Sequence, residues 1–157
     1  MLFDPHAVIS PITKDISIGG LLSYAKSEQL GQFQFVMNVA WEFTDYESGD
    51  SGPFDKDTLE NGTVVHMARI DDVDDVDSVR SQEREILRAV GLLNEARARG
   101  ERALVTCAAG RNRSALVIAE HLILVGGKPH EVVTLIQTAR NRALNNNAFV
   151  RWLKRRR

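Results

Sequence analysis

The chain has 157 residues, of which 43% are hydrophobic and 26% charged, so it has the size and balance of one ordinary globular domain over residues 1–157. Its 20 basic and 21 acidic residues nearly cancel, which excludes binding to nucleic acid or a membrane through overall charge and leaves only local patches for it. The one cysteine excludes an internal disulfide. The sequence has no run of about 18 apolar residues and no signal-peptide pattern, so we expect a cytoplasmic protein without a membrane partner.

The first half of the chain alternates short apolar runs with polar segments. Residues 15–19 and 34–39 are predicted to be strands, with a helical stretch over 21–30 between them. Residues 41–62 are acidic and rich in Gly, Ser and Asp, which predicts a long surface loop. Residues 63–70 are predicted to form a third strand, which leads into a cluster of aspartates.

The second half is more regular. Apolar residues recur at helical spacing over 78–99, and the short apolar run at 102–107 is typical of a strand buried on both faces of a parallel sheet. Helices are predicted over 114–125, 129–140 and 147–155. Alternating strands and helices imply an α/β fold, here a single domain with a mostly parallel sheet of four to five strands flanked by helices.

The stretch with the clearest chemistry is the end of the strand at 102–107 and the turn after it. The strand delivers Cys107 into a small-residue turn that opens directly into a helix. Backbone N–H groups in such a turn point inward, and the helix N-terminus adds partial positive charge, so the turn can hold a phosphate dianion. The positions predicted to bind phosphate are Ala108, Ala109, Gly110, Arg111, Asn112 and Arg113.

Cys107 and Arg113 are the two side chains expected to act in this turn. The inward-pointing amides, the helix dipole and Arg113 all favour the thiolate of Cys107, which is the nucleophilic form. The guanidinium of Arg113 is a planar fork that can bind two phosphate oxygens at once, a geometry that lysine lacks.

The arrangement Cys107-x5-Arg113-Ser114 resembles the signature loop of the protein tyrosine phosphatase superfamily, and the chain as a whole resembles the compact dual-specificity branch. The similarity also covers four other stretches, which are Gly19-Gly20, residues 36–39, residues 99–105 and residues 146–149. It implies a dual-specificity phosphatase-like fold.

The resemblance also implies an activity. Enzymes of this family hydrolyse phosphate monoesters, here phosphotyrosine and phosphoserine or phosphothreonine in proteins, through a phosphocysteine intermediate that would form on Cys107. Ser114 matches the hydroxyl that helps the thiolate to leave. No metal and no other cofactor are implied, and the expected partner is a phosphorylated protein or another phosphorylated substrate.

The family uses an aspartic acid, upstream of the cysteine at a strand end, to protonate the leaving oxygen and later activate water. Asp72 is the first choice, because the apolar Ile70 lies two residues before it as in the family pattern, and Asp71 is the second. The interval between these aspartates and Cys107 is a few residues longer than is usual in the family, so Asp75 is a third candidate for the acid. A hard-metal site built from these aspartates is the less favoured reading.

Several residues depart from the family pattern or leave alternatives open. Thr106 stands where the family has a histidine, which leaves a catalytically weak phosphate-binding module as one alternative. Arg111-Asn112 is similar to the loop of the family's RNA triphosphatases, which suggests an RNA 5′-triphosphatase or nucleotide phosphatase with RNA or another polyanion as its partner. The basic end at 154–157 could add an RNA contact. Asn38 is a candidate to brace the turn that follows Cys107, which we call the phosphate loop (residues 107–113), by a hydrogen bond.

Overall fold

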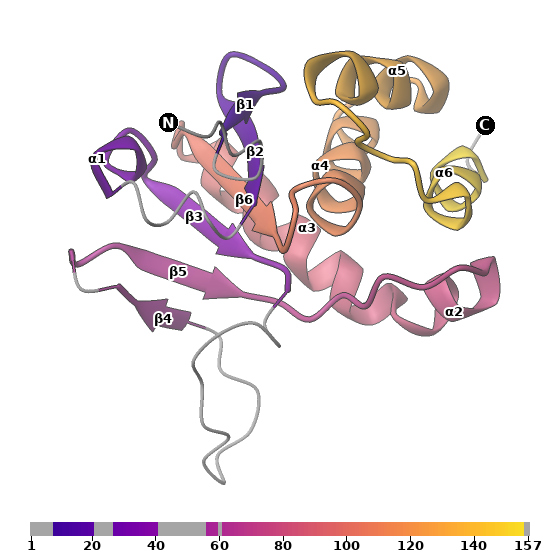
Figure 1. Ribbon diagram of the computed structural model, residues 1–157, viewed down its shortest axis with the longest axis horizontal. Helices are drawn as coiled ribbons and strands as arrows, with labels where there is room; N and C mark the ends of the chain where they lie inside the picture. The colour runs from indigo at the N-terminus through magenta and orange to yellow at the C-terminus, as the bar shows by residue number, and fades with distance from the viewer. Residues whose placement is uncertain (1–7, 21–26, 41–55, 60, 156–157) are drawn as a thin grey trace, which may run out of the picture.

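The computed structural model describes residues 8–20, 27–40, 56–59 and 61–155, and its centre is a six-stranded sheet (Figure 1). The strands are β1 (Ser10–Pro11), β2 (Ile16–Gly20), β3 (Phe35–Asn38), β4 (Lys56–Thr58), β5 (Val64–Met67) and β6 (Ala103–Cys107). Their order across the sheet is β1-β2-β6-β3-β5-β4. The inner strands β2, β6, β3 and β5 are parallel, whereas β1 and β4 pair antiparallel at the two edges.

The helices lie on the two faces of this sheet. They are α1 (Ser27–Leu30), α2 (Val76–Ser81), α3 (Glu83–Ala98), α4 (Arg113–Leu124), α5 (Pro129–Ala139) and α6 (Asn147–Lys154). Figure 1 shows α3, α4, α5 and α6 packed together beside the sheet, with α1 apart from them. The larger core cluster contains side chains from α3 to α6, and the smaller one contains Leu30 of α1.

The alternation of side chains along the inner strands explains why both faces need cover. Phe35 and Met37 of β3 belong to the larger cluster, and Val36 between them belongs to the smaller one. In β6, Leu104 and Val105 likewise face opposite clusters, and every residue of that strand is buried. Successive side chains of a strand point to opposite faces, so this continuous apolar run is what a doubly covered central strand requires.

The predicted fold class is confirmed, although the sheet has more than the four to five strands expected. The two additional strands, β1 and β4, lie at the edges and are too short for a pattern of alternation to predict them. Strand β4 falls inside the loop predicted over 41–62, so that prediction is wrong for Lys56–Thr58, while residues 41–55 lie outside the described part of the chain. Of the helix predicted over 21–30, the structure describes Ser27–Leu30.

The helix predicted over 78–99 is two helices, α2 and α3, which meet at Gln82. The side chain of Gln82 accepts a hydrogen bond from the backbone N–H of Asp71 at 2.6 Å and donates one to the carbonyl of Asp71 at 3.0 Å. Asp75 begins α2 earlier than predicted, because its carboxylate accepts from the backbone N–H of Ser78 at 2.8 Å as an N-cap. The break and the cap together hold the aspartate-rich segment against the helical layer.

Candidate active site

Cys107 is the last residue of β6 and lies at the carboxyl edge of the parallel strands. Its backbone is in register with Gly20 of β2, and the preceding Thr106 is in register with Asn38 of β3. The thiol is buried, and its Sγ lies 3.2 Å from the Oγ of Ser114. The carboxyl edge of a parallel sheet is where α/β proteins place their ligands, so the thiol occupies a position suited to chemistry.

The turn after Cys107 leads directly into α4, whose N-cap is Asn112. The side chain of Asn112 makes no capping hydrogen bond to this helix, and the N-terminus of a helix is a place where backbone N–H groups and the helix dipole favour a bound anion. Ala108 and Ala109 are small and only half buried, which leaves room above the thiol. The strand, turn and helix therefore follow one another in the order that the sequence predicted for this segment.

Gly110 is packed tightly at the base of the turn. Its φ is +66°, and a Cβ atom built there would lie 2.5 Å from the backbone C and O of Gly19 and 2.9 Å from Nη2 of Arg140. The turn therefore needs glycine for two reasons, the positive φ and the close approach of β2.

We expect Gly110→Ala to destabilise the fold by more than a positive φ alone explains, by about 2 to 4 kcal/mol when a strain of about 1 kcal/mol is combined with overpacking of about 1 to 3 kcal/mol. Gly100→Ala is the matched control, because Gly100 has a φ of +75° but nothing within 4 Å of its would-be Cβ. The measurement is urea unfolding of both variants and the wild type. Equal losses of stability in the two variants would contradict this prediction, because they would show that the close contacts of Gly110 add nothing to the cost of its positive φ.

Arg140 supports the turn from below, a role that the sequence did not reveal. Its guanidinium is buried and donates to the carbonyl of Ala109 at 3.1 Å, to the carbonyl of Val8 at 2.7 Å and to Oγ of Ser10 at 3.0 Å. Burial lowers the pKa of Arg140, and the proximity of Cys107 opposes that shift. Arg140 thus joins the turn to the first described residues of the chain and places a cation near the thiol.

Arg113 is the first residue of α4 and is 8% exposed. Its Nη1 donates to the backbone carbonyl of Ile70 at 3.3 Å. This bond joins the turn after β6 to the chain just before the aspartate cluster, so the two parts of the predicted site lie side by side. Packing around the buried guanidinium limits the directions in which its fork can point.

The structure separates the three aspartates that the sequence could not. Asp72 lines the pocket above Cys107, whereas Asp71 and Asp75 do not. The carboxylate of Asp71 lies 3.4 Å from Nε of Arg69. The carboxylate of Asp75 caps α2, and its hydrogen bonds with Ser78 lower its pKa, which makes it a poor proton donor.

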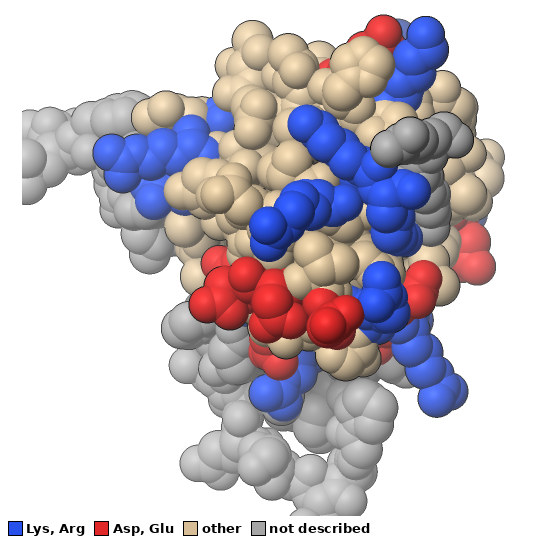
Figure 2. Space-filling model, turned by 90° about the vertical axis from the view of Figure 1, so that its right-hand side faces the viewer, with Lys and Arg blue, Asp and Glu red and all other residues tan. Residues whose placement is uncertain are grey.

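The pocket has a volume of about 210 Å³ and is formed by residues from the turn after β6, the aspartate cluster and the turn before α6. Its lining residues are Asp72, Cys107, Ala108, Ala109, Arg111, Asn112, Arg113 and Asn145. Figure 2 views the molecule from the side on which Figure 1 shows α2 and α6, and on it acidic side chains form a band with basic side chains next to it. Charges of both signs therefore lie close together on this side of the molecule.

The turn before α6 supplies two residues that the sequence reasoning did not assign to the site. Asn112 Nδ2 donates to Oδ1 of Asn145 at 2.6 Å, and Asn112 Oδ1 accepts from the backbone N–H of Asn146 at 3.0 Å. Asn146 in turn donates from Nδ2 to Oδ1 of Asp72 at 2.6 Å. A run of asparagines before an apolar stretch does indicate a helix N-cap, but nothing local indicates a contact with Asp72.

Asn38 was the residue expected to brace the turn after Cys107, and Thr106 is the residue in place of the family's histidine; their described hydrogen bonds are as follows. Oδ1 of Asn38 accepts from the backbone N–H of Ala40 at 2.9 Å, so the hydrogen bond described for its side chain is to its own strand end and not to the phosphate loop. Oγ1 of Thr106, the residue in place of histidine, donates to the carbonyl of Met37 at 3.3 Å. In the described ranges, no group of three or more His, Cys, Asp or Glu side chains is arranged to hold a metal ion.

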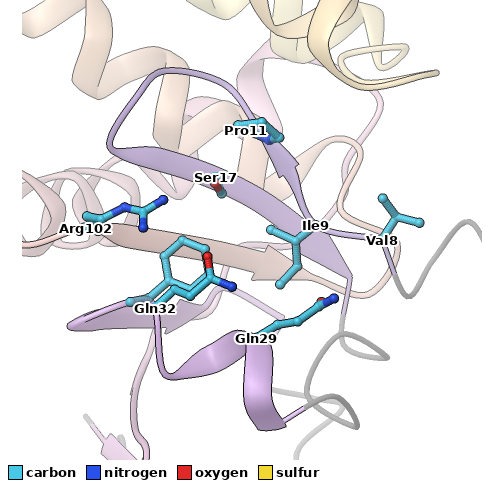
Figure 3. Close-up of a pocket in the computed structure, with 8 residues that line it drawn as sticks. Val8, Ile9, Pro11, Ser17, Gln29, Gln32 and Arg102 are labelled. Carbon is cyan, nitrogen blue, oxygen red and sulfur yellow. The ribbon is translucent and has the colours of Figure 1, made fainter.

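A larger pocket of about 300 Å³ lies away from Cys107, near β1, β2 and α1 (Figure 3). It is lined by Val8, Ile9, Pro11, Ser17, Gln29, Gln32, Phe33 and Arg102. This pocket contains no nucleophile beside a titratable acid, so the smaller pocket is the candidate for chemistry.

No helix within the described residues is long and apolar enough to cross a membrane.

Comparison with known proteins agrees with this geometry. The sequence model of the dual specificity phosphatase catalytic domain matches residues 21–157. The structure is similar to that of human DUSP28, with a TM-score of 0.68 and 20% identity over 98% of this chain and 93% of that one. It is also similar to DUSP15 (TM-score 0.72, 17% identity, 93% and 85% covered) and to a mouse putative dual specificity phosphatase complexed with zinc tungstate (0.69, 20%, 98% and 87%).

No curated protein sequence matches the chain significantly. The solved structures are less than 25% identical and bear on the fold, whereas the family match covers most of the sequence, including Cys107 and Arg113. The chain therefore belongs to the dual specificity phosphatase catalytic domain family, the cysteine-based phosphatases of the protein tyrosine phosphatase superfamily.

Proposed function

We propose that this protein hydrolyses phosphate monoesters of proteins, both phosphotyrosine and phosphoserine or phosphothreonine, through a phosphocysteine intermediate on Cys107. The observation that carries the proposal is one pocket lined by Cys107, Arg113 and Asp72. The matched catalytic domain, residues 21–157, leaves little room between its helices and strands for the additional loops that deepen a cleft selective for phosphotyrosine, which favours the broader substrate range.

In the first step, the thiolate of Cys107 attacks phosphorus and the bond to the ester oxygen breaks. The leaving oxygen takes a proton from the carboxyl group of Asp72. Arg113 and the N–H groups of the turn hold the phosphate oxygens as the phosphorus atom becomes trigonal bipyramidal in the transition state.

In the second step, a water molecule attacks the phosphocysteine. The carboxylate of Asp72 takes a proton from that water, and the bond between phosphorus and Sγ of Cys107 breaks. The hydroxyl of Ser114 donates a hydrogen bond to the departing sulfur, and its Oγ already lies 3.2 Å from Sγ. Inorganic phosphate is released and the thiolate is restored.

The test is release of p-nitrophenol from p-nitrophenyl phosphate with a metal chelator present. We expect the wild type to turn over, and Asp72→Asn to lower kcat by about 10²-fold or more, as for loss of a general acid. Asp71→Asn is the matched control and should retain activity, because its carboxylate lies beside Arg69. If the wild type is inert but binds inorganic phosphate, the protein is a phosphate-binding module.

A second candidate function is that of an RNA 5′-triphosphatase or nucleotide phosphatase, with RNA or another polyanion as partner. It is favoured by Arg111, which lines the pocket and has no carboxylate partner among the described residues. Arg155 in the basic C-terminal end is bound internally, with Nη1 2.9 Å from Oε1 of Glu120, and so contributes less to this reading. Release of the terminal phosphate from triphosphate-ended RNA, faster than from p-nitrophenyl phosphate, would favour it.

A further inference from the structure

Asn146 makes direct contact with the proposed acid from a distant part of the chain. It lies in the turn between α5 and α6, and its Nδ2 donates to Oδ1 of Asp72 at 2.6 Å and to the backbone carbonyl of Val73 at 2.7 Å. One side-chain amide therefore holds both the carboxylate of Asp72 and the backbone next to it.

The remaining polar atoms of Asn146 hold it in place. Its Oδ1 caps α6 by accepting from the backbone N–H groups of Ala148 and Phe149 at 2.9 Å and 3.2 Å. Its backbone N–H donates to Oδ1 of Asn112, which is in the phosphate loop, at 3.0 Å. Phe149 and Trp152 of α6 are buried in the core, so the N-terminus of α6, where Asn146 lies, is held against the core.

Asp72 needs such a partner because its own side chain is exposed. An exposed carboxylate samples many rotamers, and general acid catalysis depends on holding the proton within reach of the leaving oxygen. The amide N–H of Asn146 occupies Oδ1 of Asp72 as an acceptor. The proton to be transferred is then carried on Oδ2, the oxygen that the amide does not bind.

We propose that Asn146 is a positioning residue, which orients Asp72 for proton transfer to the leaving group and ties it to the phosphate loop through Asn112. This inference rests on the proposed function, in which Asp72 is the acid. A purely structural role as the N-cap of α6 is the alternative. The two roles use different atoms of the side chain, Nδ2 for Asp72 and Oδ1 for the cap, so they can be separated.

Asn146→Ser is the variant that separates them. Serine is a good N-cap residue, so its hydroxyl oxygen can keep the bonds to the first turn of α6, but it is too short to replace the Nδ2 bond to Asp72. Asn147→Ser is the matched control, because Asn147 is an exposed residue of the first turn of α6 outside the pocket. Urea unfolding of both variants checks that the cap is retained.

The measurement is kcat/KM for aryl phosphates whose leaving phenols span a wide range of acidity. Phenyl phosphate needs protonation of its leaving oxygen, whereas 2,4-dinitrophenyl phosphate scarcely does. We expect Asn146→Ser to lower kcat/KM by about tenfold for phenyl phosphate and by less than about twofold for 2,4-dinitrophenyl phosphate. The tenfold loss is a part of the rate enhancement of about 10² to 10⁴ that a general acid supplies. On the Asp72→Asn background, Asn146→Ser should cause no further loss.

An equal loss for all substrates would overturn the inference, as would no loss for any of them. Both results would leave the proposed function standing if Asp72→Asn itself shows the dependence on the leaving group. If Asp72→Asn shows no such dependence, the acid has been misassigned, and the inference about Asn146 fails with it. Inhibition by inorganic phosphate should be unchanged in Asn146→Ser, because the phosphate loop is not altered.

Discussion

Cys107→Ser is expected to lower kcat for p-nitrophenyl phosphate by on the order of 10⁴-fold or more, as for removal of a covalent nucleophile. The hydroxyl of serine is far weaker as a nucleophile than a thiolate near neutral pH. Its size is close to that of the thiol, so the buried site next to Ser114 should accept it without a large loss of stability. Activity and binding should therefore separate in this variant.

Two measurements complete this test. Binding of inorganic phosphate, followed by calorimetry, should persist in Cys107→Ser because the N–H groups of the turn and Arg113 are unchanged. Acid quenching during turnover should trap phosphate covalently on the wild type and not on Cys107→Ser. A Cys107→Ser protein with more than a small fraction of wild-type activity would rule out the thiolate mechanism.

Arg113→Lys is expected to lower kcat by about 10² to 10³-fold, the loss seen when one donor to a developing charge is removed. Lysine keeps the positive charge but has no planar fork, so it cannot bind two phosphate oxygens side by side. The substitution also removes the Nη1 bond to the carbonyl of Ile70 and so loosens the link between the phosphate loop and the aspartate cluster. The assay is again release of p-nitrophenol.

Arg151→Lys is the matched control, because Arg151 is an exposed residue of α6 that does not line the pocket. Its activity should equal that of the wild type. If Arg113→Lys were equally active, charge alone would suffice at this position, and the bidentate role of Arg113 would be wrong. Comparing kcat with KM shows whether the loss lies in the transition state or in substrate binding.

The nucleophile segment was predictable because its features are local. A buried strand, a small-residue turn and a helix follow each other between residues 102 and 125, and each can be recognised from neighbouring residues. The structure gives this segment as β6 and α4, with Cys107 and Arg113 where the pattern put them. The helices α5 and α6 and the strands β2, β3 and β5 were predictable for the same reason.

The edge strands and the helix break were not predictable from local pattern. Strands β1 and β4 are two and three residues long, too short for alternation to appear, and each exists because a neighbouring strand offers hydrogen bonds. The break between α2 and α3 depends on a side-chain bond from Gln82 to Asp71, which lies eleven positions away. Such partners are decided by packing and not by propensity.

The sequence by itself predicted the fold class, the family and the segment that carries Cys107 and Arg113, because each rests on patterns that can be recognised from neighbouring residues. Only the tertiary structure shows which of the aspartates lines the same pocket as the thiol. The side chains of Asp71, Asp72 and Asp75 are chemically equal in the sequence, and they differ through Arg69, the cap of α2, and Asn146 at a separation of 74 residues. Contacts over that distance form only when α6 packs against the core, so the order of residues along the chain carries no local sign of them.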